Sequence, residues 1–551
     1  MTRPTATQIA TAPRTVWCLI EGQHTDRTVA DLATRGRFVH HGVTLDLGRR
    51  PDWVGGGLPS DAEWRIEWVK LYEGLHLAHA FGLTGDPVYQ QTWEDLVDSF
   101  CEQVPVGHDT SDVTARRTQN WLYAWQQFDR AECFSGFTPG FEERLADRLQ
   151  LDVQHLRLHL TPERNHRTLE IYSLLLTHLA LNADLEPARE ALDLLADNAA
   201  TDIWPDGVHR ECSTDYHMLV LRSLVGAIAN AEQFGLEVPG ALRRATERAS
   251  TFAVHVQRPD GATPSFSDGD VGHFGPFLAD AARVLDRPDL AWVASRGAAG
   301  APPRERSTGF PIGGYYTQRS GWGTTGRHYA DERFALFDCG PLGDGGHGHY
   351  DQLSVELYAA GQTLVVDPGR FTYADGPDGW RHWFKGTAGH NTLTVDNLDQ
   401  VPYRPGKPKG PQPTARLVGR WTVSGLDVLV GEATSPVHDA THRRTLAMVD
   451  DDHWLVHDDV AAPEPHTYAV RWHLDARAHG RTTLQVEADD VVCRAPGVSL
   501  RVPRGCGQVR IEQGWVSPSY GVREPAPVLV ISAEHTRAAR IVTVIAAEEG
   551  S

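Results

Sequence analysis

The chain has 551 residues, of which 41% are hydrophobic and 9% aromatic, enough apolar material for about two to four packed domains. Its 52 Lys and Arg residues against 72 Asp and Glu residues give a formal net charge of −20. A field of that sign disfavours nucleic acid and anionic membranes as main partners, so an anionic substrate would need a locally basic pocket.

The first residues and the cysteines indicate the cellular compartment of the protein. Residues 1–15 lack the apolar core of about 7–15 residues that a secretory signal contains, and no apolar stretch is long enough to span a bilayer. Seven cysteines stand singly, without a Cys-x-x-Cys pair. We therefore expect a cytoplasmic protein with reduced thiols and no cysteine-based zinc site.

The region from residue 64 to about 290 predicts one helix after another. Trp68, Leu71, Leu75 and Ala78 follow the 3–4 spacing of a buried helical face. Thr161 stands before a proline, a combination typical of a helix start. Further helices are expected over 113–129, 141–160, 161–181, 186–199, 213–234 and 241–256. Such a run favours an (α/α) toroid or solenoid with a groove on its concave face.

The pattern changes near residue 300, and beyond residue 310 short β-type runs alternate with Gly, Pro, Asp and Asn turns. Strands are expected at 314–318, 333–339, 353–358, 362–366, 391–395, 426–432, 453–460 and 540–546. With no clear helical interruption, these runs favour stacked antiparallel sheets. We predict a helical domain over residues 1–305 and a β-sandwich over residues 306–551.

Residues able to bind a metal or to move protons crowd into the segment 345–391. His347 and His349 are two positions apart, so in an extended chain both face the same side. Asp367 and His390 flank apolar runs that adjacent strands can bring together. Two imidazoles and a carboxylate suit a zinc-type site, and spacing alone would place both His347 and His349 on the metal. In a chain with 27 histidines, the alternative is that these residues only satisfy turns.

A second polar cluster lies in the helical half. Asn165 and His166 fall in the first turn of a predicted helix, where free backbone N–H groups favour an anion. Tyr216 and His217 open another helix, shortly after Glu211. Taken alone, each motif is more typical of a helix cap or of packing than of a functional site.

The order of these motifs resembles the heparinase II/III family of polysaccharide lyases. The series consists of Asn-His at 165–166, Glu-x-Ser-x-x-Tyr-His at 211–217, Gly-His-Gly-His at 346–349, Val-Asp-Pro-Gly at 366–369 and Gly-x-x-x-His-Asn-Thr at 386–392. The resemblance runs from about residue 64 to residue 400. It implies an (α/α) toroid followed by an antiparallel β-sandwich, in agreement with the organisation expected from the patterns above.

The resemblance also separates the two neighbouring histidines. It assigns His347 to catalysis, and it assigns His349, Asp367 and His390 to one divalent metal ion. Zinc is the expected metal, in a structural role that fixes the loop carrying His347.

The same resemblance implies catalytic roles in the removal of the C5 proton of a uronic acid and the loss of the C4 oxygen. Asn165 and His166 would neutralise the carboxylate so that negative charge can develop. Tyr216 would act as base and then as acid on one face of the sugar, and His347 as base for the other C5 epimer. Independently of the resemblance, Arg370, Tyr373, Arg381 and Lys385 lie in the same stretch as the histidines, so we expect them to bind anionic groups of the substrate, or else to form a solvated surface patch.

We therefore expect a lyase that cleaves uronic-acid-containing polysaccharides or oligosaccharides by β-elimination, with short oligosaccharides trimmed from one end as an extension of that view. The alternatives are a uronate C5-epimerase, a metal-dependent glycan hydrolase and a non-catalytic carbohydrate-binding protein. A lyase product gains ultraviolet absorbance, whereas an epimerase incorporates solvent deuterium at C5 without it.

Overall fold

The computed structural model describes residues 14–55, 57–406 and 409–548. The N-terminal segment without a visible secretory signal therefore lies almost wholly outside the described residues. By packing, the chain forms two compact units: the first runs to Asp202 and adds Val220–Thr246, and the second comprises Ile203–Leu219 and the chain from Glu247 onward. The domain limits at residues 305 and 306 stay a prediction. Within the described ranges, no helix is both long and apolar enough to cross a membrane.

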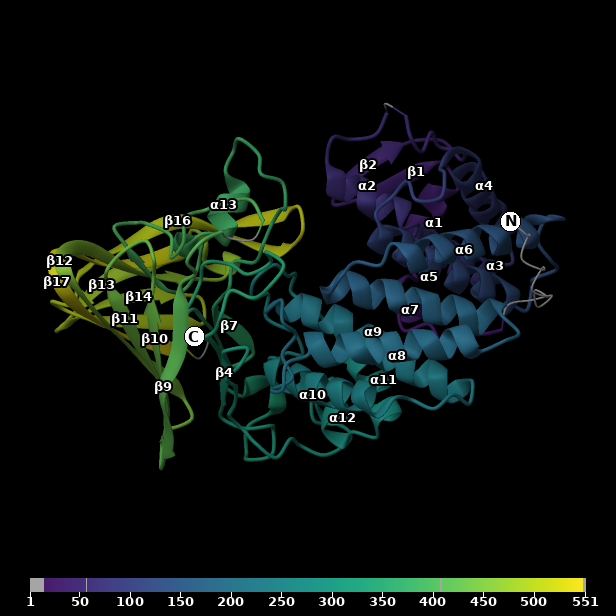
Figure 1. Ribbon diagram of the computed structural model, residues 1–551. Coiled ribbons are helices and arrows are strands. Elements are labelled where there is room, and N and C mark those ends of the chain that lie inside the picture. The colour runs from purple at the N-terminus through teal and green to yellow at the C-terminus, as the bar shows by residue number, and fades with distance from the viewer. Residues whose placement is uncertain (1–13, 56, 407–408, 549–551) are drawn as a thin grey trace. The chain divides into compact units, whose positions relative to one another are not determined.

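The helices occupy the purple-to-teal part of the chain in Figure 1. They are α1 (Arg27–Ala33), α2 (Ala62–Val69), α3 (Glu73–Thr84), α4 (Pro87–Gln103), α5 (Ser111–Asp129), α6 (Phe141–Leu158), α7 (Arg164–Leu181), α8 (Glu186–Asp202), α9 (Thr214–Gln233), α10 (Gly240–Val256), α11 (Gly275–Leu285) and α12 (Pro288–Ala294). A small hairpin of β1 (Arg37–His40) and β2 (Val43–Asp46) precedes α2.

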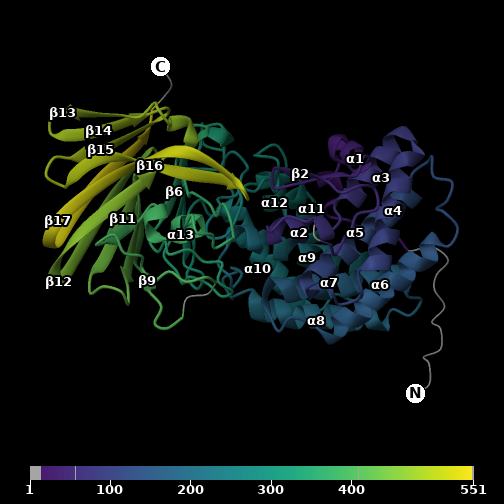
Figure 2. The ribbon, with the colours of Figure 1, turned by 90° about the horizontal axis from the view of Figure 1, so that it is seen from above.

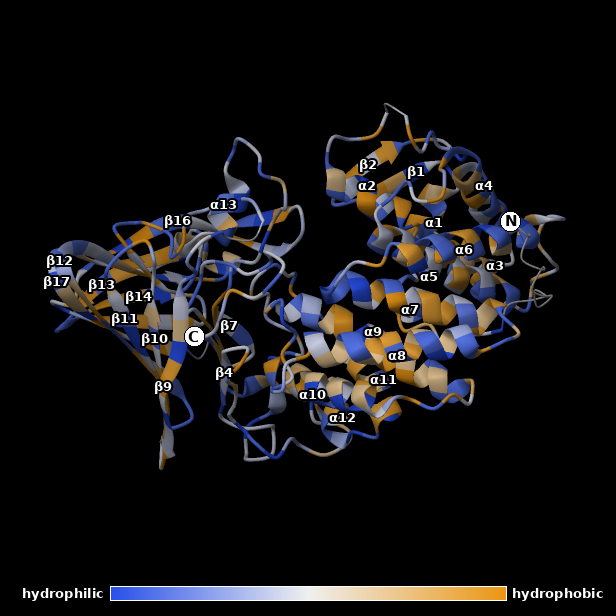
Figure 3. Cartoon of the chain, viewed as in Figure 1, coloured by the Kyte–Doolittle hydropathy of each residue, from blue (hydrophilic) through white to orange (hydrophobic). Residues whose placement is uncertain are grey.

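The helices of the first unit pack in two rows. The helices α3, α5 and α7 pack on one another in sequence, and α4, α6 and α8 cover them as a second row. Being enclosed, α5 buries most of its residues, including Trp121 and Trp125. Figure 3 shows hydrophobic and hydrophilic positions alternating along the helices, as the 3–4 spacing predicts. This two-row arrangement is that of an (α/α) toroid.

The expected helical face over Trp68–Ala78 is divided between two helices. Helix α2 ends at Val69, Leu71 adopts a left-handed conformation with φ 53°, and α3 begins at Glu73. A residue with a side chain is disfavoured at that φ, and the turn breaks the backbone hydrogen-bond ladder. The apolar spacing continues across the break because both helices bury their apolar side chains.

The strands of the second unit form two antiparallel sheets. The smaller sheet has the order β3 (Thr308–Phe310), β4 (Tyr315–Arg319), β5 (Phe334–Asp338), β6 (Val355–Ala359), β7 (Gln362–Val365). The larger sheet has the order β13 (Thr483–Glu487), β14 (Asp490–Ala495), β15 (Val498–Pro503), β17 (Val522–Ala547), β12 (His453–His473), β11 (Thr441–Val449), β10 (Leu426–Thr434), β9 (Thr414–Val423). In addition, β16 (Gln508–Ser519) pairs with β17, and β8 (Leu393–Val395) pairs with β12. Figure 2 shows the long strands β12 and β17 side by side.

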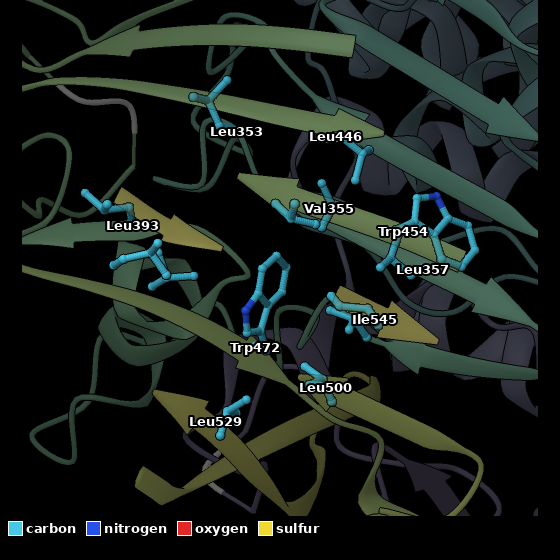
Figure 4. Packing of buried hydrophobic residues seen from close by; sticks show 14 of the residues in the cluster. Leu353, Val355, Leu357, Leu393, Leu446, Trp454, Trp472, Leu500, Leu529 and Ile545 are labelled. Carbon is cyan, nitrogen blue, oxygen red and sulfur yellow. The ribbon is translucent and has the colours of Figure 1, made fainter. Parts of the chain in front are cut away.

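The two sheets share one hydrophobic core. Val355 and Leu357 of the small sheet belong to the same buried cluster as Trp454, Trp472 and Ile545 of the large sheet, as Figure 4 shows. Two sheets whose inner faces interdigitate in this way form a β-sandwich. The predicted fold class, a helical toroid followed by an antiparallel β-sandwich, is confirmed.

An α-helix interrupts the strands, contrary to the sequence-based expectation. The short helix α13 (Trp380–Lys385) lies between β7 and β8 and starts after Gly379, which has a φ of 70°. Its residues Arg381, Phe384 and Lys385 are buried. Six residues rich in aromatic side chains carry too little periodicity to be told from a strand.

Candidate active site

The candidate site is assembled from loops and helix ends that are distant in sequence, all of them in the second unit. The contributions are Tyr216 from the first turn of α9, Asp268 from the loop between α10 and α11, His347 and His349 from the loop between β5 and β6, Asp367, Arg370 and Tyr373 from the segment after β7, Arg381 from α13, and His390 from the turn before β8.

The loop that carries the two neighbouring histidines depends on its glycines. Gly346 has a φ of 91°, and a Cβ atom on Gly348 would lie 1.7 Å from the carbonyl oxygen of Leu342. Only glycine fits such a close backbone approach. The tight loop turns the imidazoles of His347 and His349 toward the same carboxylate, that of Asp268.

Tyr216 and His347 form the centre of the site. Their rings are stacked, with centroids 4.0 Å apart and an interplanar angle of 28°. The hydroxyl of Tyr216 lies 3.0 Å from the hydroxyl of Tyr373, and Arg370 donates a hydrogen bond to that second hydroxyl through Nη1. Arg370 is itself anchored by Asp270, with Nε 3.1 Å from Oδ1. The phenol of Tyr216, the imidazole of His347 and the guanidinium of Arg370 therefore belong to one cluster.

The surroundings of Tyr216 keep its hydroxyl protonated in the resting protein. Burial raises the pKa of Tyr216 above its usual range, while the charge of Arg370 and the hydrogen bond with Tyr373 act in the opposite direction. The same two neighbours would stabilise a phenolate if one formed. The hydroxyl is thus neutral at rest and has its stabilising partners already in place.

Asp268 is buried, and its carboxylate accepts several hydrogen bonds. One oxygen, Oδ2, lies 3.1 Å from His347 Nδ1 and 2.8 Å from Arg381 Nη2. The other, Oδ1, lies 3.1 Å from His349 Nε2 and also accepts from Arg381 Nη1. Burial by itself would raise the pKa of the carboxyl, but Arg381 and the two histidines outweigh it and hold the pKa well below its usual range.

Three buried side chains could hold a metal ion. The ligand atoms of His349, Asp367 and His390 all lie within 4.8 Å of one another. Nδ1 of His349 is buried without a hydrogen-bond partner among the described residues, and Nδ1 of His390 lies 3.1 Å from Asp367 Oδ2. His390 holds its other nitrogen, Nε2, 2.9 Å from the carbonyl oxygen of Phe384. The donor set and the bare nitrogen fit a divalent ion bound through both Nδ1 atoms.

The charges at this cluster also fit a cation. Burial lowers the pKa of His349 to about 4, so its imidazole is neutral as a ligand must be. Burial would lower the pKa of His390 too, but Asp367 outweighs it and raises that pKa to about 9. Without a metal, the imidazole of His390 is therefore protonated at neutral pH. A divalent cation would displace that proton.

The predicted substrate ligands have protein partners of their own. Arg381 is 7% exposed, and both of its terminal nitrogens face Asp268. Lys385 donates to the carbonyl oxygens of Gly346 and Gly406, and burial lowers its pKa to about 8. Arg370 and Tyr373 contact Tyr216 as described. The expected contact of these residues with substrate stays a prediction.

Asn165 and His166 belong to the first unit. Asn165 is 2% exposed in the first turn of α7, whereas the His166 side chain is 48% exposed, with Nε2 3.9 Å from Asp112 Oδ2. Helix α7 begins at Arg164 rather than at the expected Thr161, and Glu163 stands at the N-cap position without a side-chain capping bond. The catalytic role of both residues stays a prediction.

Two residues of the site are missed by sequence reasoning. Asp268 sits in a Ser-Asp-Gly-Asp turn that has no motif of its own. Tyr520 lies in the turn between β16 and β17, and its ring centroid is 5.6 Å from that of Tyr373. This turn is tied to the site by main-chain hydrogen bonds, from Gly521 N to Phe371 O at 2.8 Å and from Val271 N to Pro518 O at 3.1 Å.

Comparison with known proteins places both parts of the chain in one family. Residues 12–279 match the family model "Heparinase II/III N-terminus", and residues 302–544 match "Heparinase II/III-like, C-terminal". A heparin-sulfate lyase of Pedobacter heparinus is 24% identical over 473 residues, covering 81% of this chain and 68% of the relative. A heparin-sulfate lyase of Bacteroides stercoris is 22% identical over 485 residues, covering 84% and 68%.

Solved structures share the fold. A heparinase III crystal structure superposes with a TM-score of 0.81 at 17% identity, over 98% of this chain and 86% of that chain. A heparan sulfate lyase mutant from Pedobacter heparinus gives a TM-score of 0.70 at 22% identity, over 95% and 83%. Because the two family models match residues 12–279 and 302–544 and the fold agrees, the chain belongs to the heparinase II/III family of polysaccharide lyases, as the order of its motifs predicted.

Proposed function

We propose that this protein is a polysaccharide lyase that cleaves uronic-acid-containing glycans by β-elimination. The observation that carries the proposal is the stacked pair of Tyr216 and His347, with Arg370 and Tyr373 beside the tyrosine hydroxyl. The heparin-sulfate lyases among the relatives support this class of reaction and an anionic glycosaminoglycan as the class of substrate.

The reaction requires removal of a weakly acidic proton from C5 and departure of the oxygen at C4. Tyr216 is suited to both steps on one face of the sugar, because a phenolate that takes the C5 proton can return it to the leaving oxygen. Arg370 donates to the Tyr373 hydroxyl, which leaves the proton of Tyr373 available to donate to Tyr216. The pair thereby stabilises negative charge on Tyr216 while the C5 proton is in transfer.

His347 is the second group able to move a proton. Its Nδ1 faces Asp268, so Nε2 is the nitrogen that remains for a substrate, and the side chain is 19% exposed. We propose that His347 removes the C5 proton of the uronate epimer in which that proton points away from Tyr216. Stacking against the Tyr216 ring fixes the plane in which the imidazole can approach the sugar.

We propose that Asn165 and His166 neutralise the uronate carboxylate, because they occupy the matching place in the family's order of motifs. Residues in the first turn of a helix place their side-chain donors at the positive end of the helix dipole. Such donors matter most as the carboxylate gains charge on loss of the C5 proton.

The metal we propose is zinc, in a structural role. It would be held by His349, Asp367 and His390, which are at most 5% exposed, so the cluster offers no open face to a glycan. When bound, the ion would cross-link three loops, one of which carries His347 only two residues from a ligand. Elemental analysis of the purified protein should find one zinc per chain; a protein that is active and stable without any metal would refute this role.

The function is tested by incubating the protein with a panel of uronate oligosaccharides and recording ultraviolet absorbance. A lyase produces a C4–C5 double bond conjugated to the carboxylate, and absorbance then grows with time. Tyr216→Phe keeps the ring and its packing on His347, so it should lower kcat by about 10²-fold or more with near-normal thermal stability. Deuterium incorporation at C5 without absorbance would instead identify an epimerase and refute the lyase.

A further inference from the structure

Asp268 contacts several residues of the site but belongs to none of the sequence motifs. Asp268 is 1% exposed, and its main chain is held at both ends: its N–H donates to His347 O at 3.0 Å, and its carbonyl oxygen accepts from Ser213 Oγ at 2.6 Å. The preceding residue, Ser267, has a φ of 64°, a conformation disfavoured for any residue with a side chain. The surrounding structure therefore imposes the position of Asp268 against a local preference.

The orientation of the carboxylate is fixed as well. Both terminal nitrogens of Arg381 donate to it, one to each oxygen. This two-point contact leaves the carboxylate plane little freedom to rotate. Each oxygen then has a second neighbour, which is His347 Nδ1 for Oδ2 and His349 Nε2 for Oδ1.

An ionised carboxylate accepts hydrogen bonds and donates none, so each imidazole must present a proton to Asp268. His347 consequently carries its proton on Nδ1, and His349 carries its proton on Nε2. In the neutral imidazoles the opposite nitrogens are bare: Nε2 of His347, which is the atom required of a base, and Nδ1 of His349, which is buried without a hydrogen-bond partner among the described residues and is the nitrogen left for a metal ion.

We propose that Asp268 is a positioning residue that sets the tautomers of His347 and His349 together and so couples the base of the reaction to the metal site. The inference rests on the proposed function for the part that concerns His347. A carboxylate behind a metal-bound histidine fixes ring orientation and ligand basicity, and its loss typically lowers metal affinity about 10- to 100-fold. Here the same carboxylate also serves the catalytic histidine.

Asp268→Asn tests the coupling, because the amide is the same size but can accept on only one of its two heavy atoms. At least one histidine must then lose its partner or change tautomer. We expect the affinity for Zn²⁺, measured by competition with a chelator, to fall about 10- to 100-fold. We expect kcat on a uronate oligosaccharide to fall about 10²-fold or more, with KM changed less than threefold.

The chain offers a matched control in Asp458. This carboxylate is equally buried, lies 2.6 Å from His442 Nε2 and accepts from Arg444 at 2.7 and 3.1 Å, but it touches no residue assigned to the reaction or to the metal. Asp458→Asn should lower thermal stability as Asp268→Asn does, yet keep Zn²⁺ affinity and kcat near wild type. Equal losses in both variants would show a general effect of an unpaired buried arginine and would overturn the proposal.

If Asp268→Asn does not fold, Asp268→Glu takes its place. Glutamate keeps the charge and the pairing with Arg381 but shifts the carboxylate by one methylene group, so it should still weaken Zn²⁺ binding at least tenfold and lower kcat. Wild-type values of both quantities in Asp268→Glu would refute a positioning role. The Zn²⁺ measurement needs no glycan, so an absence of lyase activity in the wild type would refute the proposed function and leave this test of Asp268 and His349 intact.

Discussion

Tyr373→Phe removes a single oxygen next to the proposed acid and base. In the structure that oxygen lies 3.0 Å from the Tyr216 hydroxyl and accepts from Arg370 Nη1. A hydrogen bond to a charged partner contributes about 1.5–3 kcal/mol, and about 1.4 kcal/mol corresponds to a factor of ten in rate. If Tyr216 carries negative charge while the C5 proton is in transfer, kcat should fall about 10- to 150-fold.

The pH dependence of the same variant has a definite direction. Arg370 and the Tyr373 hydroxyl lower the pKa of Tyr216 against the raising effect of its burial. Without the Tyr373 hydroxyl the pKa of Tyr216 rises further, so the part of the pH–rate profile that reports a Tyr216 phenolate should move to higher pH. Initial rates from ultraviolet absorbance, measured to as high a pH as both enzymes stay folded, would give the fall in kcat, and an alkaline rise in rate that begins at higher pH in Tyr373→Phe than in the wild type would confirm the direction.

Protein stability separates this explanation from a packing effect. The phenylalanine ring keeps the contact with Tyr520, and Arg370 keeps its bond with Asp270, so the free energy of unfolding should change by no more than about 1 kcal/mol. Tyr403→Phe is the control, since it removes a hydroxyl bonded to Asp375 Oδ1 at 2.6 Å and should leave kcat unchanged. A Tyr373→Phe enzyme with wild-type kcat would refute the role of Tyr373 as a stabiliser of Tyr216.

Asn165→Ala should lower kcat by about 10²-fold while the fold stays intact, and a rise in KM at constant kcat would show a binding residue instead. His349→Ala should lose its metal by elemental analysis and melt at a lower temperature, because an ion that joins three loops contributes to folding; an unchanged melting temperature would contradict the structural role. Burial would raise the pKa of Asp458, but Arg444 and His442 outweigh it and lower that pKa from 3.8 to about 2. The ionised Asp458 carboxylate therefore stabilises the folded protein fully above pH 3.8, and this stabilisation is lost as the pH falls through 2. Asp458→Asn should remove about 2 kcal/mol of unfolding free energy at pH 6 and flatten the pH dependence below pH 4, as measured by urea denaturation.

The helical and the β-sheet parts of the fold could be predicted because the apolar residues of each part follow one dominant spacing. The 3–4 spacing over the helices and the short runs after residue 310 reflect faces that pack against a single core. The break at Leu71 and the helix α13 were not predictable, since a single left-handed residue and a six-residue helix leave the periodic signal almost unchanged. Tertiary contacts decide such local details.

The candidate site divides in the same way. His349, Asp367 and His390 could be grouped by their order along the chain, and the structure brings their ligand atoms together. Spacing alone would have added His347 to that group, but its imidazole stacks on Tyr216 and faces Asp268. Asp268 could not be found from sequence, because its role exists only once the loop between α10 and α11 is folded onto the loop between β5 and β6.

The turn between β16 and β17 has a consequence for how such enzymes diversify. Main-chain hydrogen bonds attach this turn to the site, from Gly521 N to Phe371 O and from Val271 N to Pro518 O, while the flanking strands are held by the register of the large sheet. Main-chain attachment does not depend on which side chain occupies position 520. An exchange of Tyr520 during evolution would therefore act first on the packing beside Thr372, Tyr373 and Arg370, while the main-chain bonds continue to hold the turn.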